Sequence, residues 1–315
     1  MKEIGGYFEL ELNVGEEYYP NSIKLNSGRN ALLYILKAYA PKKIFIPKYV
    51  CNSVLEPIIK MNIEFEFYYL KKNLDPILPS HFDKEDFLLY VNYFGIKDDT
   101  TRDLADKIEN MIVDNSQAFF SKPSKLPAFY SPRKFFGVAD GAYLFTEKII
   151  NDILKRDISY NRSIYLLKRL DLDSQQGYQD YFLAEESFSN EPIKIMSKST
   201  QRILASIDYE RIKNIREKNF LFIHNELKGL NELNLDLKHL NGPMKYPFLI
   251  QNENLKDFLI KNKIYASTYW KEVLKRVDEN SFEYYLTKYL VPLPIDQRYD
   301  ENDMTILIKK INEVL

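Results

Sequence analysis

The chain has few of the residues that build disulfides and metal sites. Its 315 residues include one cysteine, one tryptophan and three histidines. The single Cys51 excludes an internal disulfide, and no histidine stands near another or near Cys51 at the spacing of metal ligands. We therefore expect no metal site. Cys51 itself is either a reactive thiol or a small core residue.

Nucleotide-binding fingerprints and an excess of one charge are also missing. The sequence contains no G-x-G-x-x-G, no G-x-x-x-x-G-K-S/T and no G-x-S-x-G, which disfavours a dinucleotide enzyme, a P-loop NTPase or a serine hydrolase. Lys and Arg total 44 against 45 Asp and Glu, so no net field favours nucleic acid or an anionic membrane. Because no apolar run resembles a signal peptide or a spanning helix, we expect a cytoplasmic protein that binds neither nucleic acid nor membrane.

The residues that are present favour a large folded core. Hydrophobic residues make up 45% of the chain and aromatic residues 14%, which is typical of globular proteins, and the length allows two domains. Short β-rich runs alternate with helical runs, and this order predicts an α/β fold with a mainly parallel sheet flanked by helices. The expected strands are 43–46, 63–70, 87–92, 111–114, 128–131 and 142–145, and the expected helices among them are 28–40, 52–61 and 101–110.

The last third of the sequence has a different pattern. A long charged amphipathic stretch is expected to form a helix over 207–227, and a closing helix is expected from Glu301. We therefore predict a large α/β domain over 1–205 and a small C-terminal α+β domain over 206–315. The stretch 149–195 is expected to be mostly polar helix, and its sequence does not indicate what role it has in the protein.

Two segments suggest a site for a phosphorylated ring. Ser27-Gly28-Arg29 opens the expected helix 28–40, where free backbone N–H groups suit a phosphate, although Ser27 also fits an ordinary helix cap. Asp114 ends an apolar strand, where a carboxylate can pair with a protonated pyridine nitrogen, and Gln117 can donate to a ring hydroxyl. A turn-forming Asp at a strand end is the plainer alternative.

Two further segments add an amine and an amide. Lys134 stands in an aromatic-rich loop 20 residues after Asp114, where lost hydration is expected to lower its pKa as a Schiff-base amine requires. Ser131 and Arg133 are close enough in sequence to serve a phosphate, although loop cations are often simply solvated. Asn92 ends the expected strand over 87–92 and can face a cofactor or substrate, although the aromatic residues beside it are more often core.

In this order, the segments resemble the DegT-type branch of fold-type-I pyridoxal-phosphate enzymes. The resemblance runs nearly from end to end of the chain and rests on four stretches. Ser27-Gly28-Arg29 resembles the family's Ser-Gly-Thr phosphate loop, and Pro47-Lys48-Tyr49-Val50-Cys51 resembles its Pro-x-Phe/Tyr-Thr segment, whose next residues lie over the ring. Asp114-Asn115-Ser116-Gln117-Ala118 resembles its Asp-Ala-Ala-Gln/His-Ala stretch, and Ser131-Pro132-Arg133-Lys134 with Asp140-Gly141 resembles its lysine segment.

The resemblance implies a fold, a cofactor and an activity. The fold is that of the aspartate aminotransferases, and the cofactor is pyridoxal 5'-phosphate bound to Lys134. Its other expected contacts are Ser27, Gly28, Arg29, Cys51, Asn92, Asp114, Gln117 and Ser131. The implied enzyme is a homodimeric aminotransferase that moves an amino group from an amino-acid donor to a nucleotide-linked keto sugar in amino-sugar or polysaccharide biosynthesis. A pyridoxal-phosphate lyase or dehydratase, or an inactive sugar-nucleotide-binding descendant, is the alternative.

The chain also departs from the family pattern. Pro192-Ile193-Lys194-Ile195 stands where the family carries a Gly-x-Asn-Tyr-Arg run, whose Asn reaches the cofactor phosphate of the partner subunit. Arg29 replaces the usual Thr, and two phenylalanines follow Lys134 in place of Asn-Leu. These changes bear on substrate choice and on the contact between subunits.

Overall fold

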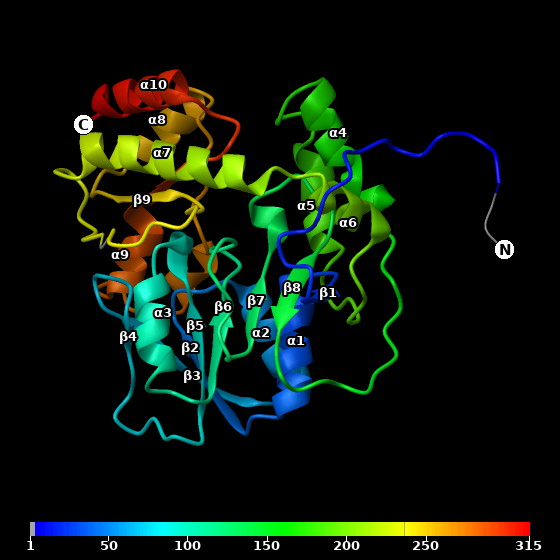
Figure 1. Cartoon of the computed structure of the whole chain (residues 1–315). Coiled ribbons are helices and arrows are strands. Elements are labelled where there is room, and N and C mark those ends of the chain that lie inside the picture. Colours follow the sequence, from blue (N-terminus) through cyan, green and yellow to red (C-terminus); the bar gives the residue numbers. More distant parts are fainter. Residues whose placement is uncertain (1–3, 236) are drawn as a thin grey trace.

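An eight-stranded sheet forms the centre of the molecule in the computed structural model, which describes residues 4–235 and 237–315. Its strands are β1 (Ile23–Leu25), β2 (Lys43–Pro47), β3 (Glu64–Leu70), β4 (Pro76–Ile77), β5 (Phe87–Val91), β6 (Met111–Asp114), β7 (Ala128–Tyr130) and β8 (Ala142–Phe145). They lie in the order β1-β8-β7-β6-β5-β2-β3-β4 (Figure 1). Strands that are neighbours in space are thus often separated in sequence by a helical crossover.

The central strands run parallel, which confirms the predicted α/β fold. β2 pairs with β3 and β5, and β6 pairs with β5 and β7, all in parallel. β8 is antiparallel to both β7 and β1, so β1 points the same way as the central strands. The carboxyl ends of β1, β5, β6 and β7 therefore meet at one edge of the sheet, where open α/β sheets bind their ligands.

Helices follow most of these strands. They are α1 (Gly28–Tyr39), α2 (Asn52–Lys60), α3 (Asp98–Ala105), α4 (Ile164–Asp171), α5 (Tyr178–Glu186) and α6 (Lys198–Ala205), with the short 3-10 turns η1 (Tyr93–Gly95), η2 (Pro132–Lys134) and η3 (Tyr160–Ser163). α1 and α2 agree with the expected helices to within one residue at each end. The helix expected over 101–110 has other bounds, since it begins at Asp98 and ends at Ala105. Asp98 and Asp99 favour the earlier start because they lie at the positive end of the helix dipole.

The last third of the chain forms a second layer, which lies above the sheet edge in Figure 1. It contains α7 (Tyr209–Leu227), β9 (Tyr246–Leu249), α8 (Leu255–Lys261), η4 (Lys271–Lys275), α9 (Phe282–Tyr289), β10 (Leu290–Leu293) and α10 (Glu301–Asn312). β9 and β10 pair antiparallel, and a separate hydrophobic cluster that includes Phe220, Phe248 and Leu307 joins them to the helices. The sequence did not predict β1, α9 or β10, which are short or lack a clear period.

The stretch 149–195, for which the sequence indicated no role, folds over the loop that follows β7. The Leu166 side chain lies 3.6 Å from the Cβ position of Gly137, and the Tyr165 hydroxyl donates to the Val138 carbonyl at 3.3 Å. The described residues before Gly15 run as an extended arm on the side of α4, α5 and α6, whereas Tyr19, closer to β1, is buried in the core (Figure 1). Within the described ranges, no helix is long and apolar enough to cross a membrane.

Glu283 on α9 carries a buried carboxylate that is only half satisfied. Its Oε1 accepts from the Leu70 amide at 2.6 Å, while Oε2 is buried and has no hydrogen-bond partner among the described residues. Burial raises the pKa of Glu283, with a smaller opposing effect of the Leu70 bond. A raised carboxyl pKa stabilises the fold fully below the unfolded pKa, and this contribution is lost as the pH rises through the folded value.

We therefore expect wild type to lose stability relative to Glu283→Gln as the pH rises from about 4 to 8, because Gln cannot ionise. Urea unfolding of both proteins across that range measures the difference. A constant difference in the free energy of unfolding at all pH values would contradict the burial argument.

Candidate active site

A hydrogen-bonded chain of three side chains links β6 to the loop after β7. Asp114 ends β6, and its Oδ1 accepts from both the backbone N–H, at 2.8 Å, and the hydroxyl of Ser116. The Lys134 Nζ donates to the same Ser116 hydroxyl at 3.2 Å. Because β6 and β7 are parallel neighbours, their carboxyl ends bring the amine and the carboxylate together on one side of the sheet edge.

The Asp114 carboxylate lies in a place that disfavours its charge. Asp114 is buried, and this burial raises its pKa more than the charge of Lys134 and the bonds from Ser116 lower it. A buried carboxylate in this state is stabilised by a cationic donor nearby. Asp114 is therefore suited to hold a protonated ring nitrogen.

The expected desolvation of Lys134 is wrong. Its side chain is exposed, whereas Phe135 and Phe136 point into the core. Lys134 is the last residue of the turn η2, and the rings of the two phenylalanines that follow it pack against Phe119, with centroids 5.6 and 4.8 Å away. The aromatic residues after Lys134 thus anchor its loop and leave the amine accessible from outside.

The expected phosphate loop is a capped helix start beside this loop. The Ser27 hydroxyl accepts from the Asn30 amide at 3.2 Å, as the plainer helix-cap interpretation predicts. The N–H groups of Gly28 and Arg29 nevertheless have no acceptor within the helix, so a cap and an anion site are compatible here. A Cβ on Gly28 would lie 3.7 Å from the Phe129 ring of β7, which sets the helix start against the site edge.

The two arginines near the expected phosphate point elsewhere. Arg29 forms an ion pair with Glu56 of α2 at 2.8 Å. Arg133 pairs with Glu185 of α5 and stacks on the Phe188 ring, 4.2 Å from its centroid. At position 29 the backbone amide, and not the side chain, is therefore the group available to a phosphate, and Arg133 holds α5 over the loop.

Gln117 and Ser131 are buried close to the chain of Asp114 and Lys134. The Gln117 Oε1 accepts from the Phe94 amide at 2.8 Å, and since a backbone N–H only donates, the NH2 end of the carboxamide is fixed as a donor. Ser131 stands directly before η2, and its hydroxyl does not cap that turn. Both residues keep a group with which a ligand can interact.

The Asn92 side chain forms its hydrogen bonds within a buried polar cluster. Its Nδ2 lies 2.7 Å from Asp98 Oδ1, 3.1 Å from Asn115 Oδ1 and 3.2 Å from Ser121 Oγ, and its Oδ1 accepts from the Lys97 amide at 3.0 Å. A contact with a cofactor would require Asn92 to give up these bonds. Its position supports a structural role in holding the end of β5.

Cys51 lies at the start of α2 and is half-buried, with its Sγ 2.8 Å from the Ser53 hydroxyl. The loop before it is held from the second layer of the molecule. Arg276 of that layer donates to the carbonyls of Lys48 and Val50 at 2.9 and 2.8 Å. The segment expected to lie over the ring is thus fixed in place by a residue more than two hundred positions away.

The structure adds residues that the sequence did not single out for this site. Ser116 bridges the amine and the carboxylate, in a place where the family pattern has Ala. The Phe135 carbonyl, one residue after Lys134, accepts from Arg216 at 3.3 Å and from Gln297 at 2.8 Å. No local pattern announces these two contacts, because the partners lie 81 and 162 residues apart in sequence.

The loop after Lys134 has a second anchor at Asp140. Its buried carboxylate accepts from the amide and hydroxyl of Ser197, at 2.8 and 2.6 Å, and from the Thr200 hydroxyl. These bonds fix the loop against the start of α6. Gly141 follows with a φ of +122°, a conformation that favours glycine, and it donates to the Asn26 carbonyl at 2.7 Å.

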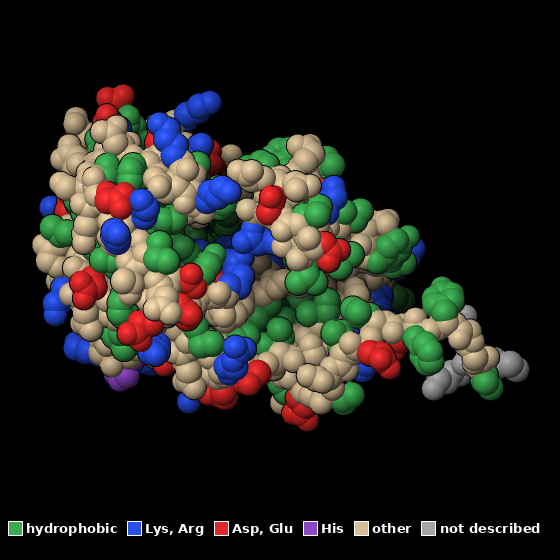
Figure 2. Space-filling view, turned by 90° about the horizontal axis from the view of Figure 1, so that it is seen from above, with side chains coloured by type: hydrophobic (Ala, Val, Ile, Leu, Met, Phe, Trp, Pro, Cys, Tyr) green, Lys and Arg blue, Asp and Glu red, His purple; other side chains and the backbone are tan. Residues whose placement is uncertain are grey.

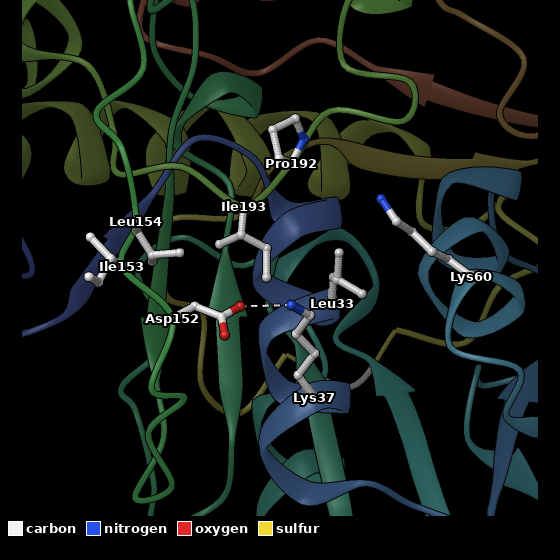
Figure 3. A pocket seen from close by; sticks show the side chains of 8 residues that line it. All are labelled: Leu33, Lys37, Lys60, Asp152, Ile153, Leu154, Pro192 and Ile193. Carbon is white, nitrogen blue, oxygen red and sulfur yellow. Dashed lines mark hydrogen bonds and ion pairs between the residues drawn. The ribbon is translucent and has the colours of Figure 1, made fainter.

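A surface cavity of about 430 Å³ lies elsewhere, along the flank of α1 (Figure 3). Leu33 and Lys37 of α1 line it together with Asp152 and Ile193, and the Lys37 ammonium pairs with Asp152 across it at 2.7 Å. None of the residues that line it belongs to the predicted site. The cavity is therefore separate from the candidate active site.

No family model matches the chain, and no curated protein matches it in sequence. Solved structures match its fold. The sugar aminotransferase CalS13 from Micromonospora echinospora is 15% identical, with a TM-score of 0.65 over 94% of this chain and 88% of that one. The PLP form of the putative sugar aminotransferase Spr1654 from Streptococcus pneumoniae is 13% identical, with a TM-score of 0.65 over 94% of this chain and 88% of that one. A DegT DnrJ EryC1 StrS aminotransferase from Brucella abortus is 15% identical, with a TM-score of 0.61 over 92% of this chain and 85% of that one. The chain therefore has the fold of these aminotransferases.

Proposed function

We propose that the chain is a pyridoxal-phosphate-dependent aminotransferase that moves an amino group from an amino-acid donor to a nucleotide-linked keto sugar. The observation that carries this proposal is the hydrogen-bonded chain of Lys134, Ser116 and Asp114 at the carboxyl edge of the sheet. The shared fold supports it, because CalS13 is named a sugar aminotransferase and Spr1654 has a PLP form.

The residues at this edge fit the cofactor. Asp114 is a buried carboxylate whose raised pKa calls for a cationic donor, and a protonated pyridine nitrogen is such a donor. The amides of Gly28 and Arg29, with the Ser131 hydroxyl, suit the phosphate, and the Gln117 NH2 suits the ring hydroxyl. Lys134 supplies the amine for covalent attachment.

The chain's own residues would then divide the work. When bound, the cofactor supplies an electron sink for the electrons released at the substrate carbon. Asp114 keeps positive charge on the ring nitrogen. The Lys134 Nζ would take the proton from the amine-bearing carbon of the donor and would deliver a proton to the acceptor carbon that receives the amino group. The Ser116 hydroxyl, which accepts from Nζ and donates to Asp114, orients the amine between these steps.

Lys134→Ala tests the assignment of the amine. We expect purified wild type to show the absorbance of a lysine-bound cofactor at roughly 400 to 430 nm, to lose it on addition of glutamate, and Lys134→Ala to lack it from the start. Lys125→Ala, which changes an exposed lysine between β6 and β7, is the matched control and should keep the band. Wild type that stays colourless with added cofactor, or a Lys134→Ala protein that keeps the band, would refute the proposal.

We also propose that the chain divides into domains over 1–205 and 206–315 and that it works in the cytoplasm. A hydrophobic cluster of its own supports the division, since its buried members all lie within 206–315, among α7, α8, α10, β9 and β10. The larger cluster under the eight-stranded sheet continues into the second layer, where it includes Tyr209, Val273 and Leu286. The boundary falls between α6 and α7. The single cysteine is compatible with a reducing compartment.

A homodimer is the proposed assembly. α4 and α5 expose a group of apolar side chains, which are Ile164, Leu167, Leu170, Tyr178, Phe182 and Leu183. Apolar side chains exposed together on two neighbouring helices favour a contact site for another protein surface. Because α4 and α5 also lie on the Lys134 loop, contact there would place a second copy close to the active site.

Leu167→Glu combined with Leu170→Glu tests this surface. We expect wild type to sediment at twice 37.4 kDa and the double variant at 37.4 kDa, since two buried carboxylates oppose association. Ile306→Glu changes an apolar residue exposed on α10 and should leave the dimer intact. A wild type that sediments as a monomer, or a double variant that remains dimeric, would remove this surface as the interface.

A further inference from the structure

Three cations gather where the second layer of the molecule meets the Lys134 loop. We name them, with one carboxylate, the junction cluster: Arg216 of α7, Lys245 before β9, and Asp296 and Arg298 after β10. Arg298 Nε and Nη2 donate to the two oxygens of Asp296 at 2.7 and 2.9 Å. The Lys245 Nζ lies 3.9 Å from the same carboxylate. The cluster therefore centres on Asp296.

Arg216 is a fully buried cation that forms no ion pair with an Asp or Glu among the residues that the structure describes. It donates to the carbonyls of Pro243 and Met244, both at 3.2 Å, and to the Phe135 carbonyl, and it stacks on the Phe135 ring. Its Nε is buried with no hydrogen-bond partner. The carbonyl bonds satisfy part of the guanidinium but leave its charge unbalanced.

The junction cluster carries more positive charge than its acid can neutralise. In the described parts of the chain, Asp296 is the one carboxylate in ion-pair contact with Lys245 or Arg298. Burial lowers the pKa of Lys245 to about 8, with help from the charges of Arg216 and Arg298. Burial likewise lowers the pKa of Arg216 to about 10. Such an excess of partly desolvated cations is costly unless an anion joins them.

Two of the three cations in the cluster are open to solvent. The side chains of Lys245 and Arg298 are 23% and 52% exposed, so an anion can reach both. Figure 2, which looks down on the second layer, shows Lys and Arg side chains in the hollow between that layer and the α4–α5 lobe. Arg169 of α4 acts electrostatically on Tyr299, next to Arg298, from the opposite side of this hollow.

Hydrogen bonds tie the cluster to the reacting end of the site. Gln297, between Asp296 and Arg298, donates to the Phe135 carbonyl at 2.8 Å, and its own Oε1 is buried with no hydrogen-bond partner. The Met244 amide, next to Lys245, donates to the Phe94 carbonyl at 2.8 Å, beside Gln117. The cations thus border both the Lys134 loop and the end of β5.

We propose that Lys245 and Arg298 form a binding subsite for an anionic group of a reactant, with Arg216 as the buried charge behind it. The inference rests on the proposed function in taking the ligand to be a reactant of that site. The anion is either the diphosphate of a nucleotide acceptor or a carboxylate of the amino-acid donor. Both present oxygens that an ammonium and a guanidinium bind as charge-assisted acceptors.

Lys245→Gln and Arg298→Gln test the subsite in the full chain loaded with cofactor. Calorimetric titration with UDP, inorganic pyrophosphate and glutamate gives the affinities, and thermal unfolding verifies that each variant is folded. Loss of one charge-assisted contact should weaken binding of the true anion roughly ten- to a hundredfold. Lys310→Gln, which removes a lysine paired with Glu313 on α10, is the matched control and should bind as wild type does.

The pattern of losses identifies the source of the anion. Weaker binding of UDP and pyrophosphate, with an unchanged KM for glutamate, indicates a nucleotide diphosphate. A raised KM for glutamate in the spectroscopic half-reaction, without binding of UDP, indicates the donor carboxylate. Wild type that binds none of the three ligands, or variants that bind all of them as wild type does, would overturn the subsite.

Lys134→Ala separates this inference from the proposed function. Its junction cluster is intact, so it should bind UDP or pyrophosphate as wild type does even though it cannot hold the cofactor covalently. Anion binding in wild type that stays colourless with added cofactor would refute the aminotransferase and keep the subsite. If wild type is coloured and reacts with glutamate, but both Gln variants bind the anions with wild-type affinity, the aminotransferase stands and the subsite is refuted.

Discussion

The parallel pairing of β6 with β7 is the constraint on which the candidate site depends. Asp114 stands opposite Phe129 in that pairing, and the Asn115 amide donates to the Phe129 carbonyl at 2.8 Å. This register fixes where the carboxylate leaves one strand and where the loop with Lys134 leaves the next. A shift of one residue would send the Asp114 side chain to the other face of the sheet and separate it from the amine.

Residues far away in sequence then hold the loops around this pair. Arg216 and Gln297 bind the carbonyl next to Lys134, Arg276 binds the loop before Cys51, and Asp140 ties the return loop to α6. Arginine suits this task because its planar group donates to several carbonyls at once. The site is therefore assembled by contacts between the two layers as much as by the sheet itself.

Unfavourable electrostatics are concentrated around the same edge. Burial raises the pKa of Asp114 and lowers the pKa of Lys245, and each group would be better solvated in an unfolded chain. The hydrophobic packing of the two layers must offset the free-energy cost of burying these two charged groups. Perturbed groups that share one edge of a sheet are a common mark of a binding or catalytic site.

Local features of the chain could be read from the sequence alone. The bounds 111–114 and 142–145 agree with β6 and β8, and Asp114 and Lys134 were both expected to belong to one cofactor site. The surroundings of single side chains could not be read from the sequence. The exposure of Lys134 and the hydrogen bonds of Asn92 within a buried polar cluster are seen only in the folded chain. Strand period and turn chemistry are set by neighbours a few residues away. Burial, ion pairs and the bonds of Arg216 depend on segments that only tertiary packing brings together.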